Sequence, residues 1–188
     1  MNQASAVELL RDKFSEIGVY EFGFTDPSGI EYLQMIRDIC AENTCRQFGK
    51  TWACPPAVGR VEECRERCLQ YDTMLVFTGL YLLNGSFDFE GMKNGMHDFK
   101  GIADRVDDVL ASYLDDYLVL SNESCDRCTS CTYPDAPCRF PDKLHHSIEG
   151  YGILVSDLAK RAGVKYNNGA GTVTFFGAVL YNKGSIKP

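Results

Sequence analysis

The sequence reads TMLVFTGLYLL from Thr73 to Leu83, which is a nearly continuous apolar run. Such a run is typical of a central strand that is buried on both faces of its sheet. Segments rich in aromatic and β-branched residues predict further strands at residues 19–24, 117–120 and 172–181. Helical patterns lie between these segments, at residues 4–17, 30–39, 61–71, 96–113 and 153–162. Because strands alternate with helices, we expect an α/β fold with a single mixed sheet of about four strands and flanking helices.

The whole-chain properties predict one domain, residues 1–188, whose core is large enough to need no disulfides. The formal net charge is -7, whereas affinity for nucleic acid depends on clustered Lys and Arg, so we expect no nucleic-acid partner. No apolar run reaches the length of a membrane span, and residues 1–17 lack the basic start and apolar centre of a secretory signal. We therefore expect a cytoplasmic protein with no membrane partner.

Cysteine is the unusual component of this chain. The chain has nine cysteines, an odd number, and we expect it to reside in a reducing compartment. These two points indicate metal or redox chemistry and argue against a disulfide framework. Most of them lie in two irregular stretches, residues 40–56 and 125–141, which the element pattern leaves as connections. Loops held by a rigid scaffold often carry function, so these two cysteine-rich loops are the candidate metal-binding segments.

The strongest motif is a run of three cysteines with two-residue gaps, Cys125, Cys128 and Cys131, followed later by Cys138. Such short gaps let successive sulfurs reach different irons of one cubane, as in bacterial ferredoxins. The motif therefore predicts a [4Fe-4S] cluster, with Cys138 as the candidate fourth ligand. The alternative is a structural zinc site with four cysteine ligands, because zinc also binds cysteine pairs with two-residue gaps.

The loop at residues 40–56 carries Cys45 and Cys54 as further candidate metal ligands. Proline restricts its own backbone and that of the residue before it, so Pro55 and Pro56 should hold Cys54 stiffly. Three roles stay open for this pair: a second metal site, a fourth thiolate for the first cluster, or a redox pair. We expect this loop to fold against residues 125–138, so that both halves of the chain contribute to one metal region.

The remaining cysteines and the histidines have simpler interpretations. Cys64 and Cys68 are four residues apart on a predicted helix and share a face, so we expect both to fill the core. His145 and His146 follow the cysteine run closely. We favour the interpretation that they form a surface pair over the alternative that they bind a metal.

With these residues identified, the chain resembles the bacterial and archaeal family of predicted metal-binding proteins known as domain of unknown function 2284. The resemblance rests on residues 45–56, 61–64 and 125–153. It implies metal binding through six cysteines of this chain, which are Cys45, Cys54, Cys125, Cys128, Cys131 and Cys138. Cys40 and Cys68 lie outside the family's pattern.

The cysteine motif favours an iron-sulfur protein with a redox, electron-transfer or sensing role and a redox partner protein. One alternative is an iron-sulfur or metal-dependent enzyme that acts on a small molecule, although the sequence singles out no catalytic base. A further alternative is a structural zinc-binding module. No oligomeric state follows from the sequence.

Overall fold

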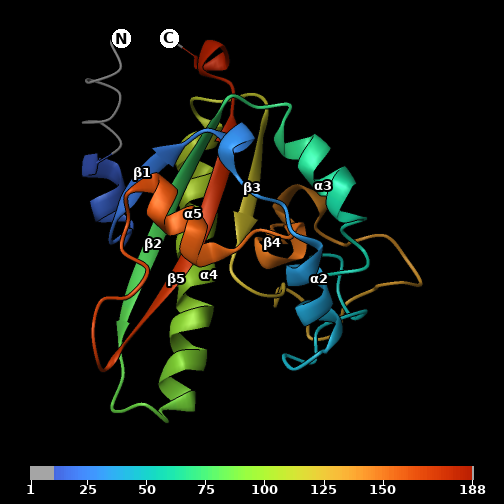
Figure 1. Ribbon diagram of the computed structural model, residues 1–188. Helices are drawn as coiled ribbons and strands as arrows, with labels where there is room; N and C mark the ends of the chain where they lie inside the picture. Colours follow the sequence, from blue (N-terminus) through green and yellow to red (C-terminus); the bar gives the residue numbers. More distant parts are fainter. Residues whose placement is uncertain (1–10, 188) are drawn as a thin grey trace.

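The computed structural model describes residues 11–187 and contains one five-stranded mixed sheet (Figure 1). Its strands, in chain order, are β1 (Phe22–Thr25), β2 (Thr73–Leu82), β3 (Tyr117–Ser121), β4 (His146–Ser147) and β5 (Thr172–Tyr181). The spatial order is β1-β2-β5-β3-β4, with every neighbouring pair antiparallel except β3 and β4, which are parallel. The predicted α/β fold with a mixed sheet is confirmed. The strand that no pattern predicted is β4, whose two residues are too few to show a period.

The apolar run at residues 73–83 forms the long strand β2, as expected. It pairs with β5 from Thr73 opposite Tyr181 to Leu82 opposite Thr172. Residues Met74 to Phe77 are fully buried, because both faces of the sheet are covered. Leu75 and Phe77 belong to one core cluster and Met74 and Val76 to the other, which is the alternation that a pleated strand imposes.

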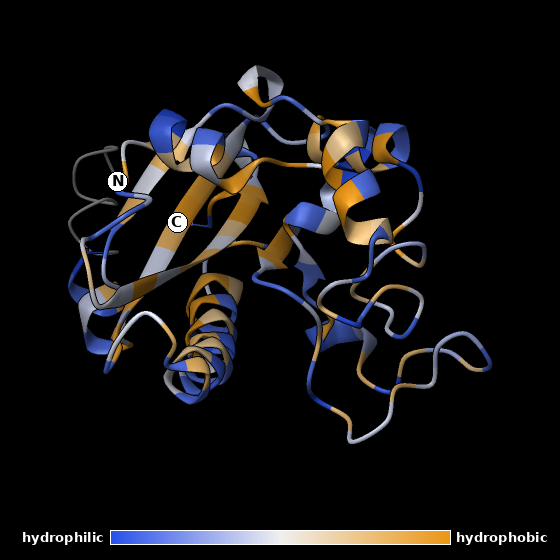
Figure 2. Ribbon diagram, turned by 60° about the horizontal axis from the view of Figure 1, so that its bottom comes forward, coloured by the Kyte–Doolittle hydropathy of each residue, from blue (hydrophilic) through white to orange (hydrophobic). Residues whose placement is uncertain are grey.

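Helices cover the two faces of the sheet (Figures 1 and 2). The helical residues 11–16 and the long helix α4 (Phe89–Ala111) pack on one face, where Phe14, Phe99 and Val106 are buried. On the other face lie α3 (Val61–Cys68) and α5 (Val155–Ala162). The short helix α2 (Gln34–Ala41) lies beside the 3-10 turn Glu149–Tyr151.

The structure shifts several predicted helix boundaries. The helix expected at 96–113 begins seven residues earlier, because Asp88 accepts a hydrogen bond from the backbone N–H of Gly91 and caps the first turn. The helix expected at 30–39 begins only at Gln34. Of the helix expected at 4–17, residues 4–10 lie outside the described part of the chain.

Cys64 and Cys68 are fully buried on α3 within the core, which confirms their predicted packing role. No helix among residues 11–187 combines the length and the apolar character that crossing a bilayer requires. Cys40 lies near the end of α2, and the connections that carry the remaining six cysteines lie together beyond the β4 edge of the sheet, at the lower right in Figure 2.

Candidate metal centre

The second cysteine loop is the connection between the parallel strands β3 and β4. Residues 122–145 make this crossing without a helix or strand, apart from the 3-10 turn Pro141–Lys143. Parallel neighbours need a long crossover, so the chain must leave the sheet and return at this point. The four cysteines of this crossover loop are half-buried.

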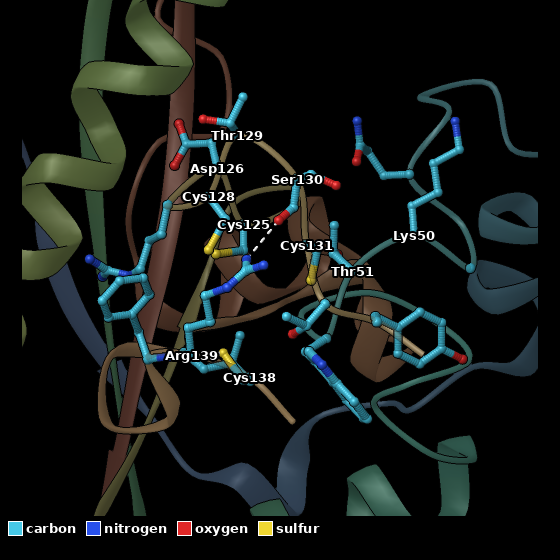
Figure 3. A pocket seen from close by; sticks show the side chains of 18 residues that line it. Lys50, Thr51, Cys125, Asp126, Cys128, Thr129, Ser130, Cys131, Cys138 and Arg139 are labelled. Atoms are coloured by element: carbon cyan, nitrogen blue, oxygen red, sulfur yellow. Dashed lines mark hydrogen bonds between the residues drawn. The ribbon is translucent and has the colours of Figure 1, made fainter. Parts of the chain in front are cut away.

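These four cysteines, Cys125, Cys128, Cys131 and Cys138, line one cavity of about 530 Å³ (Figure 3). The opposite wall comes from Gly49 to Trp52, in the first cysteine loop. A single cavity therefore collects all the thiols of the predicted cluster motif. The structure places Cys45 and Cys54 outside its lining, with Cys45 exposed and Cys54 buried.

Three contacts fasten the first loop to the second. The indole Nε1 of Trp52 donates a hydrogen bond to the Ala136 carbonyl at 3.1 Å, and its ring meets Tyr133 edge-to-face at 4.9 Å. The hydroxyls of Thr51 and Ser124 share a hydrogen bond of 3.0 Å. The expectation that the two loops fold together is thus confirmed. Trp52 covers the cavity wall and does not fill the main core.

Positive charge gathers around the thiols. The cavity lining contains Lys50, Arg127 and Arg139 but only one carboxylate, Asp126, although the whole chain has a net charge of -7. Arg139 reaches across the cavity and donates a hydrogen bond to the Ser130 carbonyl at 2.8 Å (Figure 3). Nearby cations favour a thiolate over a thiol, which suits a metal ligand.

Burial, nearby charges and backbone N–H groups act on two of these cysteines, Cys125 and Cys138. Burial raises the pKa of the Cys125 thiol, while the backbone N–H and the charge of Arg127 and the charge of Lys100 act in the opposite direction. The backbone N–H of Phe140 donates to Cys138 Sγ at 3.4 Å. Hydrogen bonds to cysteine sulfur are one of the means by which proteins tune an iron-sulfur centre.

Cys54 lies behind the cavity in a polar interior. Burial raises the pKa of its thiol, and hydrogen bonds with Ser124, Thr51 and Ser147 oppose that rise. Cys54 is thus shielded from solvent, and the stiffness expected from Pro55 and Pro56 stays a prediction. Cys40, which the motifs left unassigned, is half-buried, and burial followed by the charge of Glu149 raises its pKa to about 11.

Ion pairs tie the second cysteine loop to one face of α4. Arg127 pairs with Asp104, and His97 Nδ1 lies 2.7 Å from an Asp126 carboxylate oxygen. At the end of the loop, His145 Nε2 lies 3.2 Å from the buried carboxylate of Asp107. The prediction that His145 lies on the surface is therefore wrong, because this contact with Asp107 holds its ring inside the protein, and only 10% of its side chain is exposed.

His146 is also half-buried, and its Nδ1 hydrogen-bonds the Tyr151 hydroxyl at 2.9 Å. Burial is the largest cause that lowers the pKa of His146, to about 4. The sequence patterns did not predict the acidic face of α4 that contacts the second cysteine loop. Its signal is the spacing of Asp104, Asp107 and Asp108 at three and four residues, which places them together on a helix.

Asp107 yields a testable pH dependence. Burial would raise its pKa, but hydrogen bonds from His145 and Tyr117 and the neighbouring cations outweigh burial and lower it from 3.8 to about 2. Since the folded-state pKa is the lower one, the stabilisation is present above the unfolded-state value and is lost as the pH falls from about 4 to about 2. We expect Asp107→Asn to lower the free energy of unfolding by about 2 kcal/mol at neutral pH, with the difference shrinking over that range.

Urea unfolding at a series of pH values measures this difference. Asp108→Asn is the matched control, because Asp108 also pairs with Lys143 but is 67% exposed. It should change stability by less than about 1 kcal/mol. A difference between wild type and Asp107→Asn that stays constant down to about pH 2 would contradict the assignment.

An α/β scaffold whose loops bring four cysteines to one cavity belongs to the class of cysteine-rich metal-binding proteins. The chain itself is a member of the family of predicted metal-binding proteins designated DUF2284, whose family model matches residues 24–181. No curated protein matches the chain, and no solved structure matches it.

Proposed function

We propose that this protein binds a [4Fe-4S] cluster through Cys125, Cys128, Cys131 and Cys138 and serves a redox role, in electron transfer or sensing. The observation that carries the proposal is the lining of one cavity by all four thiols of the ferredoxin-like run. Bound there, the cluster would supply one-electron transfer. A redox partner protein and a cytoplasmic location are parts of this proposal.

The spacing of the candidate ligands supports a cluster over a single zinc ion. A tetrahedral zinc site needs all four sulfurs at about 2.3 Å from one point. Among residues 11–187, no three Cys, His, Asp or Glu side chains are placed to hold one metal ion. A cubane binds each thiolate at a different iron, so its ligands surround a volume without converging on a point. The lining of one cavity by all four cysteines is compatible with that requirement.

The charge of the cavity supports the same proposal. A cluster with four thiolate ligands carries net negative charge, and burying it without compensation is costly. Lys50 and Arg139 provide compensating charge from two separate parts of the lining, whereas Arg127 is already paired with Asp104. Zinc alternatives share this benefit, so metal analysis must separate them.

A ligand role for Cys45 and Cys54 stays a prediction. The Cys54 thiol hydrogen-bonds the hydroxyl of Ser124, which precedes Cys125 in the chain. This hydrogen bond connects Cys54 to the loop that carries the proposed cluster ligands. Cys45 is exposed and lies outside the lining of the metal cavity.

We expect protein made in iron-replete cells and purified without oxygen to contain iron and acid-labile sulfide in roughly equal amounts, near four of each per chain. It should absorb broadly in the visible, because iron-thiolate and iron-sulfide bonds carry charge-transfer transitions. Elemental analysis for iron, sulfide and zinc tests this. Stoichiometric zinc with no sulfide under these conditions would reject the cluster and leave the zinc module.

A further inference from the structure

The two residues inside the first gap of the cysteine run both reach α4. A carboxylate oxygen of Asp126 lies 2.7 Å from Nδ1 of His97, and Arg127 forms an ion pair with Asp104. His97 and Asp104 are seven residues apart, a spacing that places them on one face of the helix. The chain between two proposed metal ligands is therefore attached to a long helix at two points.

The attachment through Arg127 is the more shielded of the two. In the Arg127 and Asp104 pair, 25% and 34% of the side chains are exposed, whereas 73% of the His97 side chain is exposed. Solvent and salt screen a partly buried pair less than an exposed one. Burial would lower the pKa of Arg127, but the hydrogen bond and the charge of Asp104 outweigh burial and raise it. We therefore expect the Asp104 contact to be the stronger attachment.

Arg127 also joins the two ends of the second cysteine loop. Its Nε donates a hydrogen bond to the Lys143 carbonyl at 2.7 Å, while Nη2 donates to Asp104. Its backbone N–H hydrogen-bonds the Cys125 thiol. A planar guanidinium can hold two acceptors in fixed directions, which a lysine ammonium does less well. One residue thus connects a proposed ligand, the far end of the loop and α4.

Asp104 itself lies behind the wall of the metal cavity. Cys125 and Arg127 line both this cavity and a second one, of about 730 Å³, between α4 and the loop. Asp104 lines only the second cavity. Any effect of the Asp104 carboxylate on a bound metal must therefore pass through its neighbours. This separates two possible roles of Arg127, because removing the carboxylate takes away the anchor and leaves the guanidinium charge in place.

We propose that Arg127 and Asp104 are positioning residues of the metal centre. Their ion pair, with the contact to the Lys143 carbonyl, holds the first two cysteines of the run at the cavity wall. Metal retention then depends on a carboxylate of α4 that does not face the metal. The inference rests on the proposed metal binding by Cys125 and Cys128, and it holds for an iron-sulfur cluster and for zinc alike.

Release of metal from the loaded full chain into excess EDTA, followed by iron and zinc analysis, tests the proposal. Asp104→Asn keeps the charge of Arg127 and removes its anchor, whereas Arg127→Lys keeps a charge and loses the planar fork. Each variant should release metal about 10- to 100-fold faster than wild type, the range typical of losing an outer-shell partner. The double variant should be little faster than the single ones, because both changes disrupt one contact.

Two further variants separate positioning from other effects. Asp104→Glu retains a carboxylate and should restore slow release. Asp108→Asn is the matched control, because Asp108 is an exposed aspartate of the same helix that pairs with Lys143. It should release metal as wild type does. Wild-type release by Asp104→Asn would mean that Arg127 acts through its charge alone and would overturn the proposal. Equally fast release by Asp104→Asn and Asp104→Glu would also overturn it.

The metal content before EDTA is added distinguishes this inference from the proposed function. A wild type that loads no metal would reject the proposed function, and the positioning roles with it. A loaded wild type whose Asp104→Asn and Arg127→Lys variants retain metal equally well would reject the positioning roles alone.

Discussion

Replacing Cys128 with serine is expected to abolish metal loading. Cys128 is the middle cysteine of the run and one of the four that line the metal cavity. Serine offers a harder and far less acidic ligand atom than a thiol, so it binds iron or zinc weakly in its place. Losing even an outer-shell partner typically costs about 10- to 100-fold in metal affinity, and losing a ligand should cost more than about 100-fold.

The same variant should loosen the loop itself. Residues 122–145 contain no helix or strand beyond one 3-10 turn, so metal binding would supply much of their folding energy. We expect limited proteolysis to cut Cys128→Ser within this segment, while wild type resists. Metal analysis and proteolysis on the same preparations measure the two effects.

Cys68→Ala is the matched control for a cysteine that packs in the core. Cys68 is fully buried on α3 and lies outside both cysteine loops. Its loss should cost about 1 kcal/mol of stability and leave metal content unchanged. Equal metal retention by the two variants would show that ligand and core cysteines have been wrongly separated.

The second large effect is expected from Gly23→Ala, on strand β1. An added Cβ would lie 1.9 Å from the carbonyl oxygen of Ala162 and 3.0 Å from its carbonyl carbon. These are backbone atoms at the end of α5, so no side-chain rotation relieves the clash. Either β1 or α5 must shift, and we expect a loss of about 3 kcal/mol in the free energy of unfolding.

Thermal unfolding should show this loss as a midpoint lowered by about 10 °C. Gly184→Ala is the control, because a Cβ there meets no atom within 4 Å. Its midpoint should stay within about 2 °C of wild type. An unchanged midpoint for Gly23→Ala would mean that β1 and α5 are less closely packed than the structure has them.

Gly23 illustrates what the sequence could not reveal about the fold. The pattern predicted a strand near this position, and the glycine looked like an ordinary member of an aromatic segment. Its close approach to Ala162 involves residues separated by most of the chain. No local period records such a contact, because it depends on how a helix lies across a sheet.

The candidate site divides in the same way. Residues 125–138 could be recognised from cysteine spacing, whereas the burial of Cys54 was not predicted. The sequence predicted that the first cysteine loop packs against the second, but not that Gly49 to Trp52 form the cavity wall. Lys100 and Asp107 were not singled out at all, since both lie within an amphipathic helix where charged residues ordinarily face solvent.

The sequence by itself determined the α/β class, the long central strand β2 and the cysteine run, because each is written in local periodicity or fixed spacing. Only the tertiary structure decided which residues surround the thiols. Loops without a repeating pattern are positioned by contacts such as Trp52 with Ala136 and Arg127 with Asp104. These contacts join residues distant in sequence, and their free energy exists only once the sheet and α4 have brought them together.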